Sequence, residues 1–308
     1  MNTRENIAGW IGRITRDLEA AGLHYGHGTD NAGDEAAWLV LHAVKAPLDG
    51  SFTDWGRPVE ADEATIIERL CALRCSSRKP LAYLTGSAFF AGLEFEVSED
   101  VLVPRSPIGE LVGDGFRPWV DPQQVRRVLD MCTGSGCIAI ASAVRLSRAT
   151  VDAADISPAA LRVAARNVAR HGLSGRVRLL ESDLFKSVPA CRYDLIVANP
   201  PYVPESSLAT LPGEYRREPG LGLVSGDDGL DAALQIMLDA PRFLGEDGVL
   251  VCEVGESDER LARAAPEIPF LWLEFARGGS GVFVLTRQQL EEAGALLAAI
   301  MEKRRHVT

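Results

Sequence analysis

The sequence has no apolar run of membrane-spanning length, no CxxC pair and no HExxH or similar set of histidines. The first absence argues against a membrane protein, and the start MNTRENIAGWIGR lacks the apolar run of a signal peptide. We therefore expect a cytoplasmic protein that does not contact a membrane. The six cysteines and five histidines are scattered without ligand spacing, which predicts reduced thiols and no structural metal.

Positive charge is also scarce. The chain has 32 Lys and Arg residues against 43 Asp and Glu residues, which gives a net charge of −11. This balance disfavours direct binding to DNA or RNA and favours a cationic partner. A length of 308 residues with 46% hydrophobic content predicts a globular protein of about two domains. No pattern in the sequence predicts an oligomeric state.

The N-terminal part of the chain has apolar residues at helical spacing, as in Trp10, Ile14 and Leu18, in three stretches before Ser77. Breaks rich in glycine or proline, GLHYGHGTDNAGDE and APLDGSFTDWGRP, separate these stretches. The segment FFAGLEFEV that follows alternates around Ala91 and Gly92, which predicts a short hairpin. We expect a helical domain over residues 1–78.

From Arg126 onward, strand-like and helix-like segments alternate, which is typical of βαβ units and a parallel sheet covered on both faces. The expected fold class is α/β, with a hairpin linker over residues 79–106 and a sheet domain over 107–308. The predicted strands are RRVLDM, TVDAAD, RVRLLES, YDLIVA, GVLVCEV, PFLWLEF and GVFVLT, and QQLEEAGALLAAIMEKRR is a predicted terminal helix.

A glycine loop follows the first of these strands in VLDMCTGSGCIAIA. Small residues between a strand and a helix let a ligand approach the backbone, although the same pattern also fits a tight turn. Asp155 ends the next strand, 25 residues beyond Asp130, near the offset at which an acid meets ribose hydroxyls. Asp155 could instead cap the following helix, but Ser157 and Pro158 already supply a cap and a first-turn residue. The loop and the acid together predict a site for an adenosyl ligand.

The charge around the loop distinguishes two such ligands. A nicotinamide dinucleotide brings a pyrophosphate, whereas S-adenosylmethionine brings a sulfonium cation, an ammonium and a carboxylate. Asp130 stands just before the loop, and no Lys or Arg lies between Asp130 and Val144, which favours S-adenosylmethionine. Asp183 in ESDLF is a candidate partner for the adenine amino group, or a plain loop aspartate.

The segment NPPY, Asn199 to Tyr202, ends the fourth predicted strand. The prolines donate no backbone N–H, so the Asn199 side-chain oxygen and the Pro200 carbonyl can together accept both hydrogens of one NH₂ group, and Tyr202 can cover a flat substrate. Planar nitrogens are poor nucleophiles, so positioning beside a methyl donor is the expected source of catalysis. The alternative is an Asx-Pro turn that only ends a strand.

With these residues assembled, the chain resembles the HemK/PrmC family of protein-glutamine N5-methyltransferases over nearly its whole length. The matching segments are FAGLEFEV, VLVPR, DMCTGSG, NPPY and EYRREPGLGLVSGDDGLD. The resemblance implies a Rossmann-like class I S-adenosylmethionine-dependent methyltransferase domain. It implies cofactor contacts by Asp130, Thr133, Gly134, Gly136, Asp155, Asp183, Leu184 and Asn199, and a catalytic turn of Asn199, Pro200 and Tyr202.

Within this family, PRSPIGELV, DMCTGSGC and YGHGTDNAGDEAAWLVL are similar to the branch that modifies large-subunit ribosomal protein three. The release-factor branch usually shows PRPxTE, and often Trp where Leu184 stands, and remains the alternative. Arg105 in VLVPRSP is interpreted as either an exposed charge or a residue near the active site. A lone amide cannot identify one glutamine among many, so we expect domain 1–78 to recognise the substrate and 107–308 to catalyse.

Two other enzyme functions fit parts of the sequence, and so does a non-catalytic ligand-binding module, against which the intact NPPY segment argues. A nucleic-acid adenine-N6 methyltransferase also carries [DN]PP[YFW], but it normally needs a basic recognition surface, which this acidic chain lacks. A dinucleotide oxidoreductase is favoured only by the GxGxxA spacing.

Overall fold

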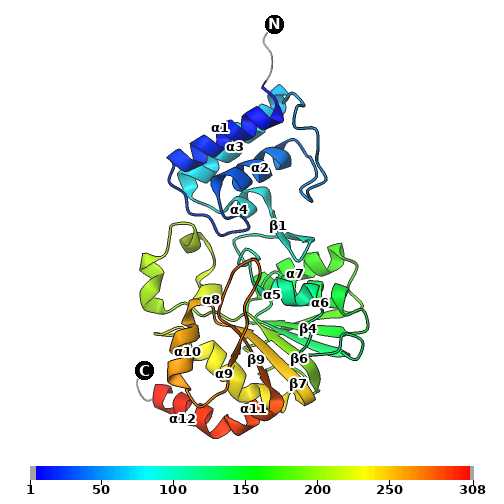
Figure 1. Ribbon diagram of the computed structural model, residues 1–308, viewed down its shortest axis with the longest axis vertical. Helices are drawn as coiled ribbons and strands as arrows, with labels where there is room; N and C mark the ends of the chain where they lie inside the picture. The colour runs from blue at the N-terminus through cyan, green and yellow to red at the C-terminus, as the bar shows by residue number, and fades with distance from the viewer. Residues whose placement is uncertain (1–4, 306–308) are drawn as a thin grey trace. The chain divides into compact units, whose positions relative to one another are not determined.

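The computed structural model describes residues 5–305 (Figure 1). The chain forms two compact units. The helical unit contains residues up to 99 together with 103–105 and 211–218, and the sheet unit contains 100–102, 106–210 and the remainder from 219. No helix among the described residues is both long and apolar enough to cross a bilayer.

The helical unit is built from α1 (Ile7–Ala20), α2 (Ala32–Ala43), α3 (Ala61–Ser77) and α4 (Leu81–Thr85), followed by strands β1 (Ser87–Phe90) and β2 (Leu93–Glu96). The side chains of Asn6 and Asn31 cap α1 and α2 by accepting backbone N–H groups. Ala91 and Gly92 have left-handed φ angles of 48° and 78°, as a two-residue turn between antiparallel strands requires. The predicted helices and hairpin are therefore confirmed.

A short segment that follows the NPPY turn in sequence also belongs to the helical unit. It contains the 3₁₀ helix η2 (Tyr215–Arg217) and carries two buried carboxylates. Glu214 accepts hydrogen bonds from the backbone N–H of His24 at 3.0 Å and from Arg74 Nη1 at 3.3 Å. Glu218 accepts from the backbone N–H of Val103. The two carboxylates thus connect this segment to residues of the same unit that are far away in the sequence.

The sheet unit is a seven-stranded sheet in the order β5-β4-β3-β6-β7-β9-β8. The strands β3 (Arg127–Met131), β4 (Thr150–Asp155), β5 (Val177–Glu181), β6 (Tyr193–Ala198) and β7 (Leu244–Glu253) are parallel. The strand β9 (Val282–Thr286) pairs antiparallel with β7 and with β8 (Leu271–Trp272). This is the predicted Rossmann-like α/β fold, and it is confirmed.

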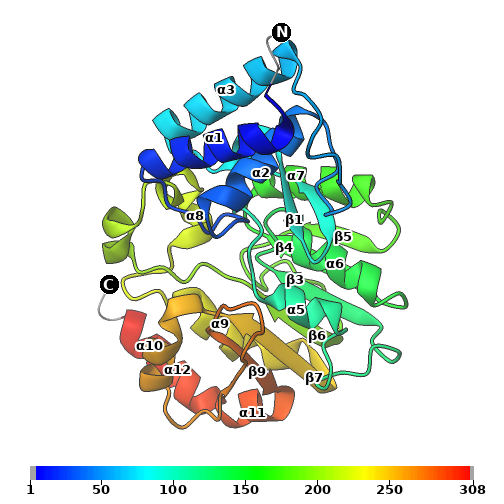
Figure 2. The ribbon, with the colours of Figure 1, turned by 45° about the horizontal axis from the view of Figure 1, so that its top comes forward.

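Helices cover both faces of the sheet, as Figure 2 shows. On one face lie α5 (Ile108–Gly113), α6 (Cys137–Arg145) and α7 (Pro158–Arg170), and on the other lie α9 (Asp231–Asp239), α10 (Asp258–Ala264), α11 (Arg287–Glu292) and α12 (Gly294–Arg305). The short elements are α8 (Gly220–Leu223), η1 (Glu205–Thr210), η3 (Ala240–Arg242) and η4 (Gly255–Ser257). Burial on both faces explains why the central strands read as continuous apolar runs.

Two predicted elements differ in the structure. The segment PFLWLEF contributes only the two-residue strand β8, at the edge of the sheet, where one side of a strand lacks a partner. The single predicted terminal helix is two helices, α11 and α12, separated at Ala293. Gly294 follows the break, and glycine is a poor helix former because it loses more backbone freedom than other residues.

Candidate cofactor and substrate site

The predicted site residues come together at the carboxyl ends of neighbouring parallel strands. Asp155 is the last residue of β4, Asp130 is next to last in β3, and Asn199 directly follows β6. The register pairs Met131 of β3 with Ala154 on one side and Ala198 on the other, so these ends lie at one edge. Ligands of open α/β sheets bind at this edge, beside the strand where the connections change direction.

The two glycines of the loop between β3 and α6 differ in their surroundings. Gly134 and Gly136 have φ angles of 55° and 81°, in the left-handed region. A Cβ built on Gly136 would lie 3.3 Å from the side chains of Ala164 and Ile140, whereas one on Gly134 would meet no atom within 4 Å. Gly136 therefore allows close packing of the loop, and Gly134 leaves space that a ligand can occupy.

Asp130 is fully buried beneath this loop. Its Oδ2 accepts hydrogen bonds from Thr133 Oγ1 and from the backbone N–H of Ala139 at 3.0 Å. Its Oδ1 has no hydrogen-bond partner among residues 5–305. Burial raises the pKa of Asp130 to about 7, and the nearby Asp155 carboxylate adds to the rise. An unpaired buried carboxylate oxygen fits a cationic N–H donor.

Asp155 holds the glycine loop against β4. Its Oδ2 accepts from the Gly134 N–H at 2.8 Å and its Oδ1 from the Ser157 N–H at 2.9 Å. Ser157 caps α7 through the Ala160 N–H, as predicted. Asp155 is thus not free of backbone partners, but each carboxylate oxygen has a second lone pair for a ligand hydroxyl. Burial raises the pKa of Asp155.

The next loop, after β5, contains Asp183 and Leu184. Asp183 is exposed and pairs with Lys186 Nζ at 2.6 Å. Leu184 has a left-handed φ of 46° and packs against the main apolar core of the sheet unit. The predicted adenine contacts of both residues stay predictions.

The NPPY turn is held by backbone hydrogen bonds at its end, whereas its amide is not hydrogen-bonded within residues 5–305. The backbone N–H groups of Tyr202 and Val203 donate to the Leu223 carbonyl at 3.1 and 2.8 Å. Among the described residues, none hydrogen-bonds the side chain of Asn199. Pro200 is buried. The amide of Asn199 is therefore available to a ligand at the edge that carries the glycine loop.

Two further residues at this edge, Glu253 and Asn167, were not predicted from the sequence. Glu253, the last residue of β7, accepts a hydrogen bond from the Tyr202 hydroxyl at 3.2 Å. Its position, an acid that ends a buried strand, is the same signal that identified Asp155. Asn167 of α7 is completely buried and donates to the Ser135 carbonyl of the glycine loop at 2.9 Å. Arg105, interpreted from the sequence as an exposed charge or a residue near the active site, belongs to the helical unit, where it forms two hydrogen bonds with Glu218.

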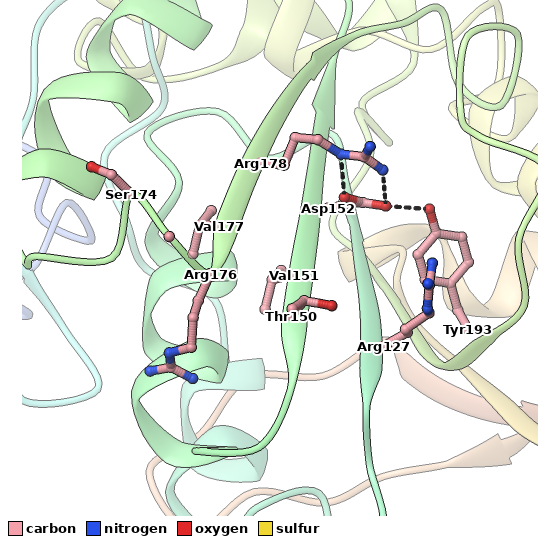
Figure 3. Close-up of a pocket in the computed structure, with 10 residues that line it drawn as sticks. Arg127, Thr150, Val151, Asp152, Ser174, Arg176, Val177, Arg178 and Tyr193 are labelled. Atoms are coloured by element: carbon pink, nitrogen blue, oxygen red, sulfur yellow. Dashed lines mark hydrogen bonds and ion pairs between the residues drawn. The ribbon is translucent and has the colours of Figure 1, made fainter.

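A cavity of about 280 Å³ lies at the opposite edge of the sheet, where β3, β4, β5 and β6 begin (Figure 3). There Arg178 makes two 2.8 Å hydrogen bonds to Asp152, which also accepts the Tyr193 hydroxyl at 2.6 Å. This cavity is separated from the predicted site by the length of the strands, and none of the predicted site residues lines it.

The chain is similar to known proteins over most of its length. The family model described as "Methyltransferase small domain" matches residues 118–211. The ribosomal protein uL3 glutamine methyltransferase of Bordetella pertussis is 48% identical, with coverage of 89% of this chain and 92% of that protein. The protein of the same name from Xanthomonas campestris is 47% identical, with coverage of 94% of each chain.

A third protein of that name, from Francisella tularensis, is 44% identical over 94% of this chain and 93% of its own length. Among solved structures, the hMettl16 catalytic domain in complex with a MAT2A 3′UTR hairpin has a TM-score of 0.51 at 17% identity, and covers 81% of this chain and 92% of that one. That likeness supports the fold alone.

Proposed function

Because the chain belongs to the family of ribosomal protein uL3 glutamine methyltransferases, we propose that it transfers a methyl group from S-adenosylmethionine to the side-chain amide nitrogen (N5) of a glutamine in uL3, the large-subunit ribosomal protein three. One observation supports the chemistry best. Asn199 presents an amide that is hydrogen-bonded to none of residues 5–305, at the sheet edge that carries the open glycine loop.

The residues at the loop fit S-adenosylmethionine, which supplies the methyl group on a cationic sulfonium. The unpaired Oδ1 of Asp130 would receive the ammonium of its methionine part, with Thr133 holding the other oxygen. The space at Gly134 would admit the same part, and Asp155 would accept ribose hydroxyls. Asp183 and Leu184 would lie near adenine.

The turn would orient the substrate amide. Asn199 Oδ1 and the Pro200 carbonyl would accept the two hydrogens of the glutamine NH₂, and the Tyr202 ring would cover its plane. An amide nitrogen is a poor nucleophile, so a fixed orientation lowers the barrier by removing the cost of bringing the reactants together. The nitrogen gains the methyl group as the bond from that methyl to sulfur breaks and leaves a neutral thioether, and the nitrogen gives up one hydrogen as a proton to water.

The affinity for S-adenosylmethionine is expected to rise as the pH increases toward about 7 and to level off above it. The pKa of Asp130 is raised to about 7, so below that pH its carboxyl is protonated and pairs weakly with an ammonium. Affinity measured by calorimetry from about pH 6 to about pH 8 should change by at most about tenfold per pH unit below the pKa. The control Asp130→Asn should remove this dependence. An equally steep pH dependence in Asp130→Asn would exclude Asp130 as its source.

We further propose that residues 1–78 recognise the substrate. A net charge of −11 favours a cationic protein, and charge pairs mainly raise association rate and specificity. A cytoplasmic location and the lack of direct contact with DNA or a membrane remain predictions from composition. Removing residues 1–78 would be a poor test, because Glu214 in the segment 211–218 would lose Arg74.

The recognition role predicts a localised effect of charge. Reversing the exposed acids Asp17 and Glu19 on α1 should slow methylation of uL3 at low salt, whereas the same change at exposed Glu246 and Asp247 of β7 should not. Raising ionic strength to about 1 M should slow the wild-type enzyme and remove the difference, because the Debye length falls to about 3 Å. Equal effects of the two double reversals would contradict recognition by this surface.

A further inference from the structure

A buried carboxylate accepts a hydrogen bond from the NPPY turn, although the proposed methyl transfer gives it no contact with cofactor or substrate. Glu253 is 4% exposed at the carboxyl end of β7. Its Oε1 accepts the Tyr202 hydroxyl at 3.2 Å, and its Oε2 accepts the Ser106 hydroxyl. A carboxylate at this depth is costly unless its oxygens are hydrogen-bonded, so these contacts hold the group in one orientation.

The carboxylate is itself fixed by its second partner. Ser106 Oγ also accepts the backbone N–H of Ile108 at 3.1 Å, which directs the serine hydrogen toward Glu253. Ser106 directly follows Arg105, which Glu218 holds through two hydrogen bonds in the helical unit. Glu253 is thus held by a residue whose chain neighbour is anchored by an ion pair.

The Tyr202 ring has little freedom on its other side. A Cβ built on Gly255 would lie 2.5 Å from ring atom Cε2, so the ring packs directly on the backbone two residues beyond Glu253. The Ser257 hydroxyl donates to the Tyr202 carbonyl at 2.8 Å. The segment from Glu253 to Ser257 therefore determines both the plane of the ring and the direction of its hydroxyl.

We propose that Glu253 is a positioning residue that acts through Tyr202. It fixes the ring that covers the substrate amide, and Ser106 fixes Glu253 in turn. This inference rests on the proposed role of the NPPY turn. It assigns Glu253 no contact with substrate or cofactor.

The test is a double-mutant cycle with kcat on unmethylated recombinant uL3. Glu253→Met keeps the length of the side chain and removes both acceptors, and Tyr202→Phe removes only the hydroxyl. Each should lower kcat about tenfold or more, as for the loss of a hydrogen bond to a charged group. The double variant should be no slower than the slower single variant. In each variant the affinity for S-adenosylmethionine should stay within about twofold of wild type, because neither Glu253 nor the Tyr202 hydroxyl is proposed to contact the cofactor.

Two further variants separate positioning from a general structural role. Glu253→Gln should restore part of the rate, because its oxygen can accept one hydroxyl and its NH₂ can donate to the other. Tyr193→Phe removes a matched tyrosine–carboxylate hydrogen bond, to Asp152 at the opposite edge of the sheet, and should leave kcat unchanged (Figure 3).

The inference would be overturned if the kcat losses of the two single variants multiplied in the double variant, or if Tyr202→Phe had a normal kcat. The proposed function would stand in either case. A fall in cofactor affinity in Glu253→Met that matches the fall in kcat would overturn it in favour of a structural role. A wild-type enzyme that does not methylate uL3 would overturn the proposed function, and the inference with it.

Discussion

Replacing Asn199 by alanine is expected to lower the methyl-transfer rate by roughly 10²-fold or more, the range for losing one positioned polar group, while S-adenosylmethionine affinity stays nearly unchanged. The amide makes no hydrogen bond to residues 5–305, so its removal breaks no hydrogen bond within this part of the chain. The β6 strand before it and the Leu223 contacts after it would remain. The measurement is single-turnover transfer to uL3, with calorimetry of cofactor binding in parallel.

A second asparagine, which is completely buried, provides the control. Asn167 supports the glycine loop through the Ser135 carbonyl, so Asn167→Ala should weaken cofactor binding. At saturating cofactor, its rate should be closer to wild type than that of Asn199→Ala. Equal losses of affinity and rate in Asn199→Ala would contradict the substrate-orienting role and indicate that Asn199 supports the fold or the cofactor.

The largest effect on stability is expected at Arg74. This side chain is 1% exposed and pairs with Glu35 at 2.7 Å and with Glu214 at 3.3 Å. Arg74→Met would leave Glu35 buried without its cation and Glu214 with only the partly exposed Arg78, which costs about 3–5 kcal/mol in the free energy of unfolding. Urea denaturation should show a lower midpoint.

Arg78 is the matched control for this prediction. It also pairs with Glu214, at 3.2 Å, but its side chain is 38% exposed. Arg78→Met should cost no more than about 1 kcal/mol, because water already screens the pair. If the two variants lost equal stability, burial of the Arg74 cluster would not be the cause.

The sequence predicted the parts of the site that local pattern controls. The β3–α6 loop, the acid that ends β4 and the Ser157 cap depend on residues within a few positions of one another, and the structure brings them to one edge. Right-handed βαβ connections restrict the possible orders of the parallel strands but do not select one. The parallel sheet could be expected from the alternation of segments alone.

The parts that were missed depend on contacts between distant residues. Tyr202 and Glu253 are 51 residues apart, Ser106 and Glu253 are 147 apart, and Arg105 and Glu218 are 113 apart. No periodicity reports such pairs. The segment 211–218 has no local signal for joining the helical unit, because its partners Arg74 and Arg105 come from elsewhere in the chain.

The most direct test of the central claim is peptide mass spectrometry of uL3 after incubation with this protein and methyl-labelled S-adenosylmethionine. The substrate would be an undermethylated ribosomal extract, with release factor and ribosomal RNA as competing acceptors. We predict one labelled methyl group on the side-chain amide of a glutamine in uL3, and none when Asn199→Ala replaces the wild type. Label on another residue type of uL3, or only on release factor or RNA, would contradict the account.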